Sequence, residues 1–144
     1  MKVSIASDHG GFILKEAVKK HLEEKGYEVV DFGTDSLASC DYPDFGRPAA
    51  QAVAKKDVDF GILICTTGIG MSMLANKIKG IRAALCSDSV SARLTREHND
   101  ANVLVMGAGI VGEILAMSIV DTFLNTNFSF EEKHVRRISK IEEL

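Results

Sequence analysis

The chain of 144 residues contains no tryptophan and few aromatic residues, which make up 6% of the total. Few rings are therefore available to enclose a flavin, which weakens a flavin-binding interpretation. The three cysteines, Cys40, Cys65 and Cys86, are an odd number and lack the CxxC or Cys/His spacing of zinc sites. A disulfide framework and a zinc site are thus both disfavoured, and each cysteine is either a buried filler or a reactive group.

Long apolar runs and a strong net charge are also missing. The longest apolar candidate, residues 58–65, contains Asp59 and is far shorter than the roughly 18 residues of a membrane span. The first residues are soon interrupted by Asp8 and do not resemble a signal peptide. We therefore expect a cytoplasmic protein with reduced thiols and no membrane partner. A net charge of −3 argues against a general nucleic-acid partner.

Short β-branched runs alternate with segments of helical periodicity along the whole chain. The predicted strands are residues 2–7, 28–32, 60–65, 81–85 and 102–106, and the predicted helices are residues 12–25, 45–56, 70–77, 89–97, 111–124 and 130–142. The strands are mostly apolar on both faces, which is typical of parallel strands covered by helices on both sides. Residues 1–144 therefore predict a single α/β domain. We expect a Rossmann-like, doubly wound, five-stranded parallel sheet in a three-layer α/β/α sandwich, with a C-terminal helix.

Ligands of such sheets bind outside the carboxyl ends of the strands. Polar residues follow three of the predicted strands at that place: Ser7-Asp8-His9, Cys65-Thr66-Thr67 and Ser87-Asp88. The end of the fourth predicted helix adds His98-Asn99-Asp100. We expect these groups to gather at one edge of the sheet and to form a ligand site.

The loop after the third predicted strand has the composition of an anion cradle. Gly68 and Gly70 allow the backbone to turn sharply and to bring its N–H groups close to a ligand, and the following helix adds the positive end of its dipole. The loop is neither a Walker loop nor a complete GxGxxG motif, so a purely structural tight turn is an alternative. Cys65 precedes the loop at a helix N-terminus, where a thiol is readily activated as a nucleophile or base. The alternative for Cys65 is a small buried residue at a strand end.

Other polar residues also have both a functional and a structural interpretation. Asp8 and His9 could contact a sugar phosphate, but Asp8 could equally cap the first helix. His21 lies in the middle of that helix and is expected to be solvated, and Cys86 is expected in the core. The last helix carries a basic cluster, which is either a solvated face or a phosphate grip: Lys133, His134, Arg136 and Arg137.

Six ordered segments span nearly the whole chain: SDHGGF at 7–12, VVDFGT at 29–34, DYP at 41–43, ILICTTGIG at 62–70, GIRAALC at 80–86 and HNDANVLVMG at 98–107. Together they resemble the type B ribose-5-phosphate isomerase family, which includes the galactose-6-phosphate isomerase subunits. Several ordered motifs at matching spacing are far more specific than one glycine loop.

The resemblance implies an isomerase that interconverts D-ribose 5-phosphate and D-ribulose 5-phosphate, a step of the pentose phosphate pathway, without a metal or an organic cofactor. Cys65 matches the base that removes the C2 proton. Backbone N–H groups of the loop would hold the oxyanion of the enediolate, and they belong to Thr66, Thr67, Gly68, Ile69 and Gly70. The side chain of Thr67 matches a threonine that assists transfer at the sugar oxygens.

The same resemblance assigns the remaining polar residues to the substrate. His98 matches the residue that helps to open the furanose ring, and Asn99 matches a substrate contact. Asp8 and His9 match a pair that binds the sugar phosphate. The phosphate-binding residues of the family match Lys133 and Arg137, with Arg136 as the substitute if the register of the helix differs.

Two positions depart from the family pattern. Many relatives have glycine where this chain has Thr66, and many have an arginine where this chain has Gly109. The missing arginine removes one phosphate contact, so either the C-terminal basic residues compensate or the preferred substrate differs. The family forms dimers whose sites draw residues from both subunits. We therefore expect a homodimer or a dimer of dimers, with a small sugar phosphate as ligand.

Two alternative functions stay open. The first is isomerisation of a six-carbon sugar phosphate, such as galactose 6-phosphate or allose 6-phosphate. Retention of both Cys65 and His98-Asn99-Asp100 favours the ribose enzyme over that alternative. The second is a non-catalytic protein that binds a phosphoryl ligand on a flavodoxin-like fold, because an anion loop by itself requires no chemistry.

Overall fold

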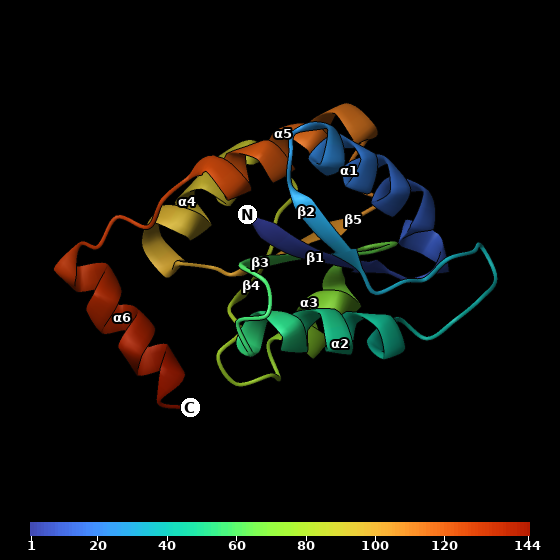
Figure 1. Cartoon of the computed structure of the whole chain (residues 1–144). Helices are drawn as coiled ribbons and strands as arrows, with labels where there is room; N and C mark the ends of the chain where they lie inside the picture. Colours follow the sequence, from blue (N-terminus) through green and yellow to red (C-terminus); the bar gives the residue numbers. More distant parts are fainter.

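The computed structural model describes all 144 residues and contains one parallel sheet of five strands (Figure 1). The strands are β1 (Lys2–Ser7), β2 (Glu28–Asp31), β3 (Phe60–Cys65), β4 (Ala83–Leu85) and β5 (Val103–Gly107). Their order across the sheet is β2-β1-β3-β5-β4, and every neighbouring pair is parallel. β2 lies on one side of β1 and the other three strands lie on the opposite side, with β5 between β3 and the edge strand β4. The strand order thus reverses direction at β1, which confirms the predicted doubly wound α/β fold.

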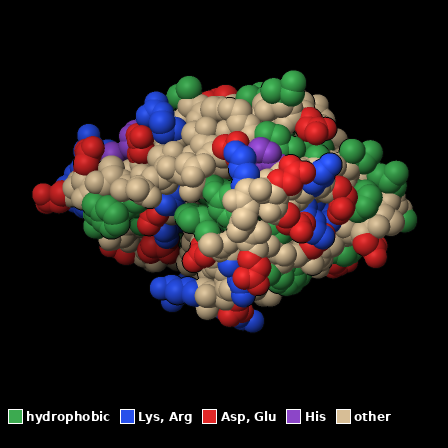
Figure 2. Space-filling model, turned by 45° about the horizontal axis from the view of Figure 1, so that its top comes forward, with side chains coloured by type: hydrophobic (Ala, Val, Ile, Leu, Met, Phe, Trp, Pro, Cys, Tyr) green, Lys and Arg blue, Asp and Glu red, His purple; other side chains and the backbone are tan.

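Helices cover both faces of the sheet. They are α1 (Phe12–Glu24), α2 (Tyr42–Ala54), α3 (Ile69–Ala75), α4 (Ser89–Asn99), α5 (Glu113–Asn125) and α6 (Glu132–Glu142). Figure 1 shows α1, α4 and α5 on one face, α2 and α3 on the other, and α6 standing off beside the sheet. On the face formed by α1, α4 and α5, acidic and basic side chains are intermixed (Figure 2). None of the helices is long and apolar enough to cross a membrane.

The core consists of two apolar layers, one on each face of the sheet. Alternate residues of β3 divide between them: Ile62 and Ile64 pack under α1, α4 and α5, whereas Leu63 and Cys65 pack against α2 and α3. All four are buried, and Cys65 is 5% exposed. This alternation confirms that the central strands are apolar because both of their faces are covered.

Several element ends differ from the sequence prediction. α2 begins three residues early, at Tyr42, because Pro43 at its start needs no N–H partner there. α4 continues through His98 and Asn99 to Asp100, whose left-handed backbone (φ 46°) ends the helix. Asp88 caps the start of α4 as expected, since its Oδ1 accepts the N–H of Ser91 at 2.7 Å.

The prediction that His21 is solvated is wrong. Its Nε2 lies 2.8 Å from Oδ1 of Asp121 on α5, and its side chain is 22% exposed. Lys25 Nζ lies 2.9 Å from the second oxygen of the same carboxylate. These contacts connect α1 to α5 over about a hundred residues of sequence, a pairing that helical periodicity does not reveal.

A buried lysine joins α1 to the end of β2. The side chain of Lys15 is 1% exposed, and its Nζ lies 2.7 Å from Oδ2 of Asp31 and 2.8 Å from Oε1 of Glu16. Lys19 Nζ approaches the same Asp31 oxygen at 3.2 Å, and the N–H of Gly33 donates to Asp31 Oδ1 at 2.8 Å. Burial by itself would raise the pKa of Asp31, but these hydrogen bonds and charges outweigh it and lower that pKa.

Replacing Asp31 with Asn is expected to lower the free energy of unfolding by about 2 kcal/mol at neutral pH, because the buried ammonium of Lys15 loses one of two carboxylate partners. Since the folded-state pKa of Asp31 is lowered, its charge stabilises the fold above the unfolded-state value of about 3.9. That contribution disappears as the pH falls through the folded-state pKa. Urea unfolding should therefore show a constant gap between wild type and variant near neutrality and a narrowing gap in acid.

Glu16→Gln is the matched control for this prediction, because it removes the more exposed partner of the same lysine. It should cost less stability than Asp31→Asn. Equal stability of wild type and Asp31→Asn at neutral pH would contradict the role given to this ion pair.

Candidate active site

Cys65 ends the central strand β3 and lies directly against the start of α3. The N–H of Gly68 donates to its Sγ at 3.2 Å, which fixes the sulfur against the first turn of the helix. Gly68 has a left-handed backbone (φ 80°), and a β-carbon there would lie 2.5 Å from Cδ1 of Leu85 and 2.9 Å from the backbone of Met106. Glycine is therefore required at position 68 both for the turn and for the close approach of β5.

The loop after β1 forms one side of this site. Asp8 is 8% exposed, and its Oδ1 accepts the N–H of Gly11 at 3.0 Å. Asp8 therefore caps the short 3-10 turn His9–Gly11 that leads into α1, and not α1 itself, whose N-cap is Gly11. The other carboxylate oxygen of Asp8 is left for a ligand. His9 Nδ1 accepts the backbone N–H of Cys40 at 3.2 Å, which orients the imidazole.

The loop after β5 forms the opposite side. The N–H groups of Ala108 and Gly109 donate to the carbonyl oxygens of Cys65 and Thr66, each at 2.8 Å. The side chain of Thr66 is exposed and lies between the two flanking loops. A β-carbon on Gly10 would lie 2.2 Å from Thr66 Oγ1, and one on Gly109 would lie 3.2 Å from Thr66 Cγ2. The two positions that depart from the family pattern, 66 and 109, are thus in contact.

Tyr42 is a site residue for which the sequence analysis proposed no role. A β-carbon on Gly70 would lie 2.5 Å from Cζ of Tyr42 and 2.7 Å from its hydroxyl, so the ring packs directly on the glycine loop. The segment Asp41-Tyr42-Pro43 carried a signal, because proline at the first turn marks a helix start. A helix that starts here presents Tyr42 at the carboxyl edge of the sheet.

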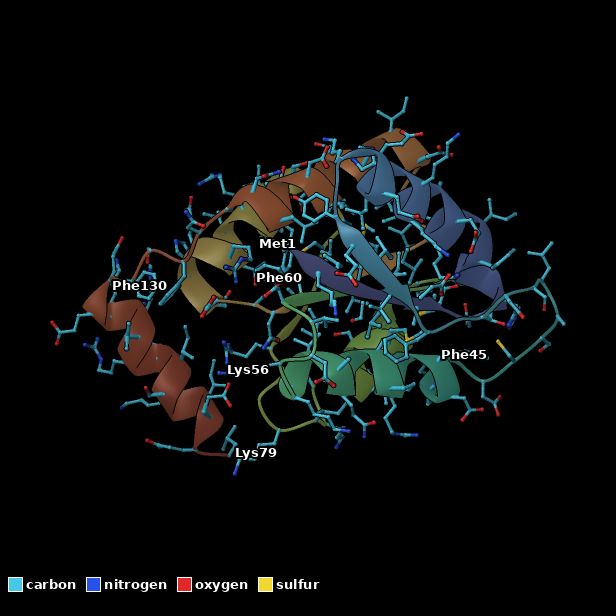
Figure 3. All side chains as sticks on the ribbon, in the orientation of Figure 1. Met1, Phe45, Lys56, Phe60, Lys79 and Phe130 are labelled. Carbon is cyan, nitrogen blue, oxygen red and sulfur yellow. The ribbon has the colours of Figure 1, made fainter.

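The expectation that all polar groups gather at one edge is wrong for His98-Asn99-Asp100. α4 leads from the carboxyl end of β4 back to the amino end of β5, so its last residues lie at the amino edge of the sheet. Arg82, just before β4, donates from Nε to the carbonyl of Asn99 and from Nη2 to the carbonyl of Asp100, both at 2.9 Å. Figure 3 shows Met1 and Phe60, near the starts of β1 and β3, on the side that faces α6, and Phe45 of α2 at the far end.

α6 is attached to this amino edge. His134 is buried, with its ring centroid 4.4 Å from that of His98, and its Nδ1 lies 3.0 Å from Oγ of Ser129. Burial, reinforced by the neighbouring His98, lowers the pKa of His134. At the far end of α6, Glu142 Oε1 lies 2.6 Å from Nη1 of Arg82.

The basic residues of α6 belong to the helix that packs on the end of α4 through His134 and His98, at the edge of the sheet opposite Cys65. Lys133, Arg136 and Arg137 are exposed, and Lys133 Nζ lies 3.7 Å from a carboxylate oxygen of Glu131. A cleft of about 770 Å³ opens between the end of α6, Asn99 and the segment that precedes β4. No group of three or more His, Cys, Asp or Glu side chains is arranged to hold a metal ion.

The predicted site residues therefore form two groups. The carboxyl-edge group consists of Asp8, His9, Cys65, Thr66, Thr67, Gly68, Ile69 and Gly70. The amino-edge group consists of His98, Asn99, Lys133, Arg136 and Arg137. Within one chain the structure does not bring the two groups together.

Comparison with known proteins identifies the family. A family model described as Ribose/Galactose Isomerase matches residues 3–141. The chain is also 48% identical over 140 residues to ribose-5-phosphate isomerase B of Escherichia coli (strain K12), with 97% of this chain and 93% of that protein covered. The chain belongs to the ribose/galactose isomerase family.

Solved structures of the family resemble this isomerase over its whole length. Ribose-5-phosphate isomerase B of Clostridium thermocellum has a TM-score of 0.97 at 52% sequence identity, with 99% of this chain and 96% of that chain covered. The Mycoplasma genitalium enzyme with bound ribulose-5-phosphate has a TM-score of 0.94 at 45% identity, with coverage of 99% and 94%. The fold and the family named from the sequence motifs are thereby confirmed.

Proposed function

We propose that this isomerase interconverts D-ribose 5-phosphate and D-ribulose 5-phosphate, a step of the pentose phosphate pathway, with Cys65 as the base. The observation that carries the proposal is the position of the Cys65 sulfur, at the carboxyl end of the central strand and within 3.2 Å of a backbone donor at a helix start. The related ribose-5-phosphate isomerases B support the choice of substrate. Three free cysteines agree with a cytoplasmic enzyme.

In the proposed reaction the Cys65 thiolate removes the proton from C2 of the open-chain aldose. The C2–H bond breaks, an S–H bond forms, and the released electron pair forms the C1–C2 double bond while the negative charge moves to the oxygen on C1. The S–H bond then breaks and its proton is delivered to C1, while the hydroxyl proton on O2 moves to the charged oxygen on C1, which leaves the C2 carbonyl of the ketose. We assign this proton transfer to Thr67, because its hydroxyl belongs to the same loop as Cys65 and is oriented by the N–H of Ile69.

Backbone N–H groups of the loop would stabilise the enediolate oxygen. Two of the five are already engaged, because Gly68 N–H donates to Cys65 Sγ and Ile69 N–H donates to Thr67 Oγ1 at 3.2 Å. We therefore assign the oxyanion contact first to the N–H groups of Thr66, Thr67 and Gly70. Gly68 and Ile69 then support the charged sulfur and the Thr67 hydroxyl. Asp8 and His9 bind the hydroxyls or the phosphate of the sugar from the β1 side.

The complete site is proposed to form between two copies of the chain. A strand of five residues spans roughly 16 Å, so groups at its opposite ends cannot act on one small sugar within a single subunit. A twofold homodimer that faces the amino-edge group of one copy towards the carboxyl-edge group of the other would complete two identical sites. His98 would then open the furanose ring, and Asn99 would contact the substrate. A dimer of dimers would repeat the same pair.

Arg137→Ala is expected to raise KM for ribose 5-phosphate by about 10- to 100-fold and to change kcat little, because arginine binds phosphate equally in the ground state and the transition state. Lys133 should behave in the same way. Steady-state kinetics of Arg136→Ala decide whether Arg136 shares the role. Lys140→Ala, an exposed cation on the same helix, is the matched control and should match wild type. A fall in kcat alone for Arg137→Ala would contradict a phosphate anchor.

A six-carbon sugar phosphate is the second candidate substrate. The observation that favours it is Gly109, which contributes no side chain at the position of the β5 loop that lies against Thr66. Values of kcat/KM measured side by side on ribose 5-phosphate, galactose 6-phosphate and allose 6-phosphate distinguish the two. A protein that only binds a phosphoryl ligand would show no exchange of the C2 proton with solvent.

A further inference from the structure

The side chain of Thr66 fills the space between the two loops that flank the candidate base. Its Oγ1 faces the β1 loop, where a β-carbon on Gly10 would approach it to 2.2 Å, and its Cγ2 faces the β5 loop, where a β-carbon on Gly109 would approach it to 3.2 Å. Two non-bonded atoms cannot approach to the first distance, and the second is tighter than an ordinary van der Waals contact. The side chain of Thr66 therefore leaves no room for a β-carbon at position 10 and little room for one at position 109.

The position of these contacts gives them a functional meaning. Gly10 follows His9 directly, so the Thr66 hydroxyl lies beside the loop that carries Asp8 and His9. The Oδ1 atom of Asp8 would lie 3.4 Å from a β-carbon on Gly10. Backbone hydrogen bonds of 2.8 Å hold the β5 loop to Cys65 and Thr66 on the other side. Thr66 is exposed, so its side chain is accessible to a ligand that binds between these loops.

We propose that Thr66 is a specificity-determining residue, whose side chain narrows the site between the β1 and β5 loops and so favours a five-carbon over a six-carbon sugar phosphate. The inference rests on the proposed isomerase function and deepens it. The contribution is steric: one methyl-sized group in a closely packed pocket discriminates substrates by roughly 10- to 200-fold. Gly109 has no side chain of its own, so at this contact between the two loops Thr66 supplies the side chain that narrows the site.

The main test compares kcat/KM on ribose 5-phosphate and on allose 6-phosphate. Thr66→Ala should raise the ratio of six-carbon to five-carbon kcat/KM about tenfold. Thr66→Val keeps the branched shape of the side chain and replaces the hydroxyl with a methyl group, so a steric role predicts a ratio within about twofold of wild type. A ratio that Thr66→Ala leaves unchanged, or that Thr66→Val shifts as strongly as Thr66→Ala, would overturn the inference.

A double-mutant cycle tests the contact itself. Gly10→Ala should lower kcat/KM on ribose 5-phosphate at least about 30-fold, because its methyl group meets Thr66 Oγ1. Gly10→Ala/Thr66→Ala should recover to within a few-fold of Thr66→Ala, since the remaining contact, with Asp8 Oδ1 at 3.4 Å, is ordinary. Gly10→Ala/Thr66→Val should stay impaired. Equal recovery with alanine and valine at position 66, or no recovery with either, would contradict the proposed steric role of Thr66.

Two further measurements complete the design. Gly112→Ala is the matched control, because no atom lies within 4 Å of a β-carbon at that position, and it should stay within about twofold of wild type. Thermal unfolding of each variant separates a folding defect from a site defect. A wild type without turnover on either sugar phosphate would refute the proposed function and this inference together. An active wild type with a ratio insensitive to Thr66→Ala would refute the inference alone.

Discussion

Cys65→Ser is expected to lower kcat for ribose 5-phosphate by about 10³-fold or more while leaving substrate binding nearly intact, because a general base contributes 10²- to 10⁴-fold. The serine hydroxyl fits the place of the thiol, but an alcohol holds its proton far too tightly to act as the base. The Gly68 N–H would still donate to the oxygen, so the loop geometry is preserved. The loss should therefore appear in chemistry and not in folding.

Three measurements check this prediction. Steady-state kinetics should show the fall in kcat, calorimetric titration should show binding of ribose 5-phosphate within a few-fold of wild type, and exchange of the C2 proton with deuterium from solvent should cease. Exchange is decisive because it reports proton removal even when later steps are slow. A Cys65→Ser enzyme that keeps kcat within tenfold of wild type would exclude Cys65 as the base.

Cys86→Ala is the matched control for the loss of a thiol. Cys86 directly follows β4 at the same edge of the sheet, but it is 2% exposed and has no glycine loop behind it. Burial, with a smaller contribution from Asp88, raises the pKa of Cys86 to about 11, so this thiol stays protonated at neutral pH. Its removal should reduce stability slightly and leave kcat unchanged.

The fold could be predicted from the sequence because its determinants are local. Apolar strands such as residues 60–65 alternate with amphipathic helices, and this pattern admits few arrangements other than a parallel sheet covered on both faces. The ends of elements were less predictable: α2 starts at Tyr42 and α4 extends to Asn99. Propensity defines such ends only to within a few residues.

The edge at which His98 lies could also have been inferred from the sequence. A helix that connects parallel strands runs antiparallel to them, so its first residue lies at the carboxyl edge and its last residue at the amino edge. Asp88 and His98 begin and end the same helix and therefore cannot share an edge. His98 is separated from Cys65 by the direction in which α4 runs, and not by any property of histidine.

Contacts between loops could not be predicted in this way. The packing of Thr66 against Gly10 and of Tyr42 against Gly70 depends on how three crossovers place their loops at one edge. The ion pair of His21 with Asp121 depends in the same way on the docking of α1 on α5. Such contacts join residues far apart in the sequence, and one sequence contains no signal for them.

A mixture of two inactive variants is expected to regain activity if the site is shared between subunits. Cys65→Ser removes the base from the carboxyl-edge group, and His98→Asn removes the ring-opening residue from the amino-edge group. In a hybrid dimer one of the two sites combines both damaged groups and the other is intact. Random assembly makes half of the dimers hybrid, so the mixture should reach about a quarter of wild-type kcat from parents that each retain about 1% or less.

The variants should be unfolded together and refolded, or coexpressed, so that subunits exchange, and the dimer should be verified by light scattering. The matched control pairs Cys65→Ser with the double variant Cys65→Ser/His98→Asn, a mixture in which no combination yields an intact site, and it should stay inactive. Recovery near a quarter would require Cys65 of one subunit and His98 of the other to act on the same sugar, as their positions at opposite edges of the sheet demand. Dimers that exchange subunits without any recovery would mean that the two groups do not serve one site, and His98 would lose its proposed role in ring opening.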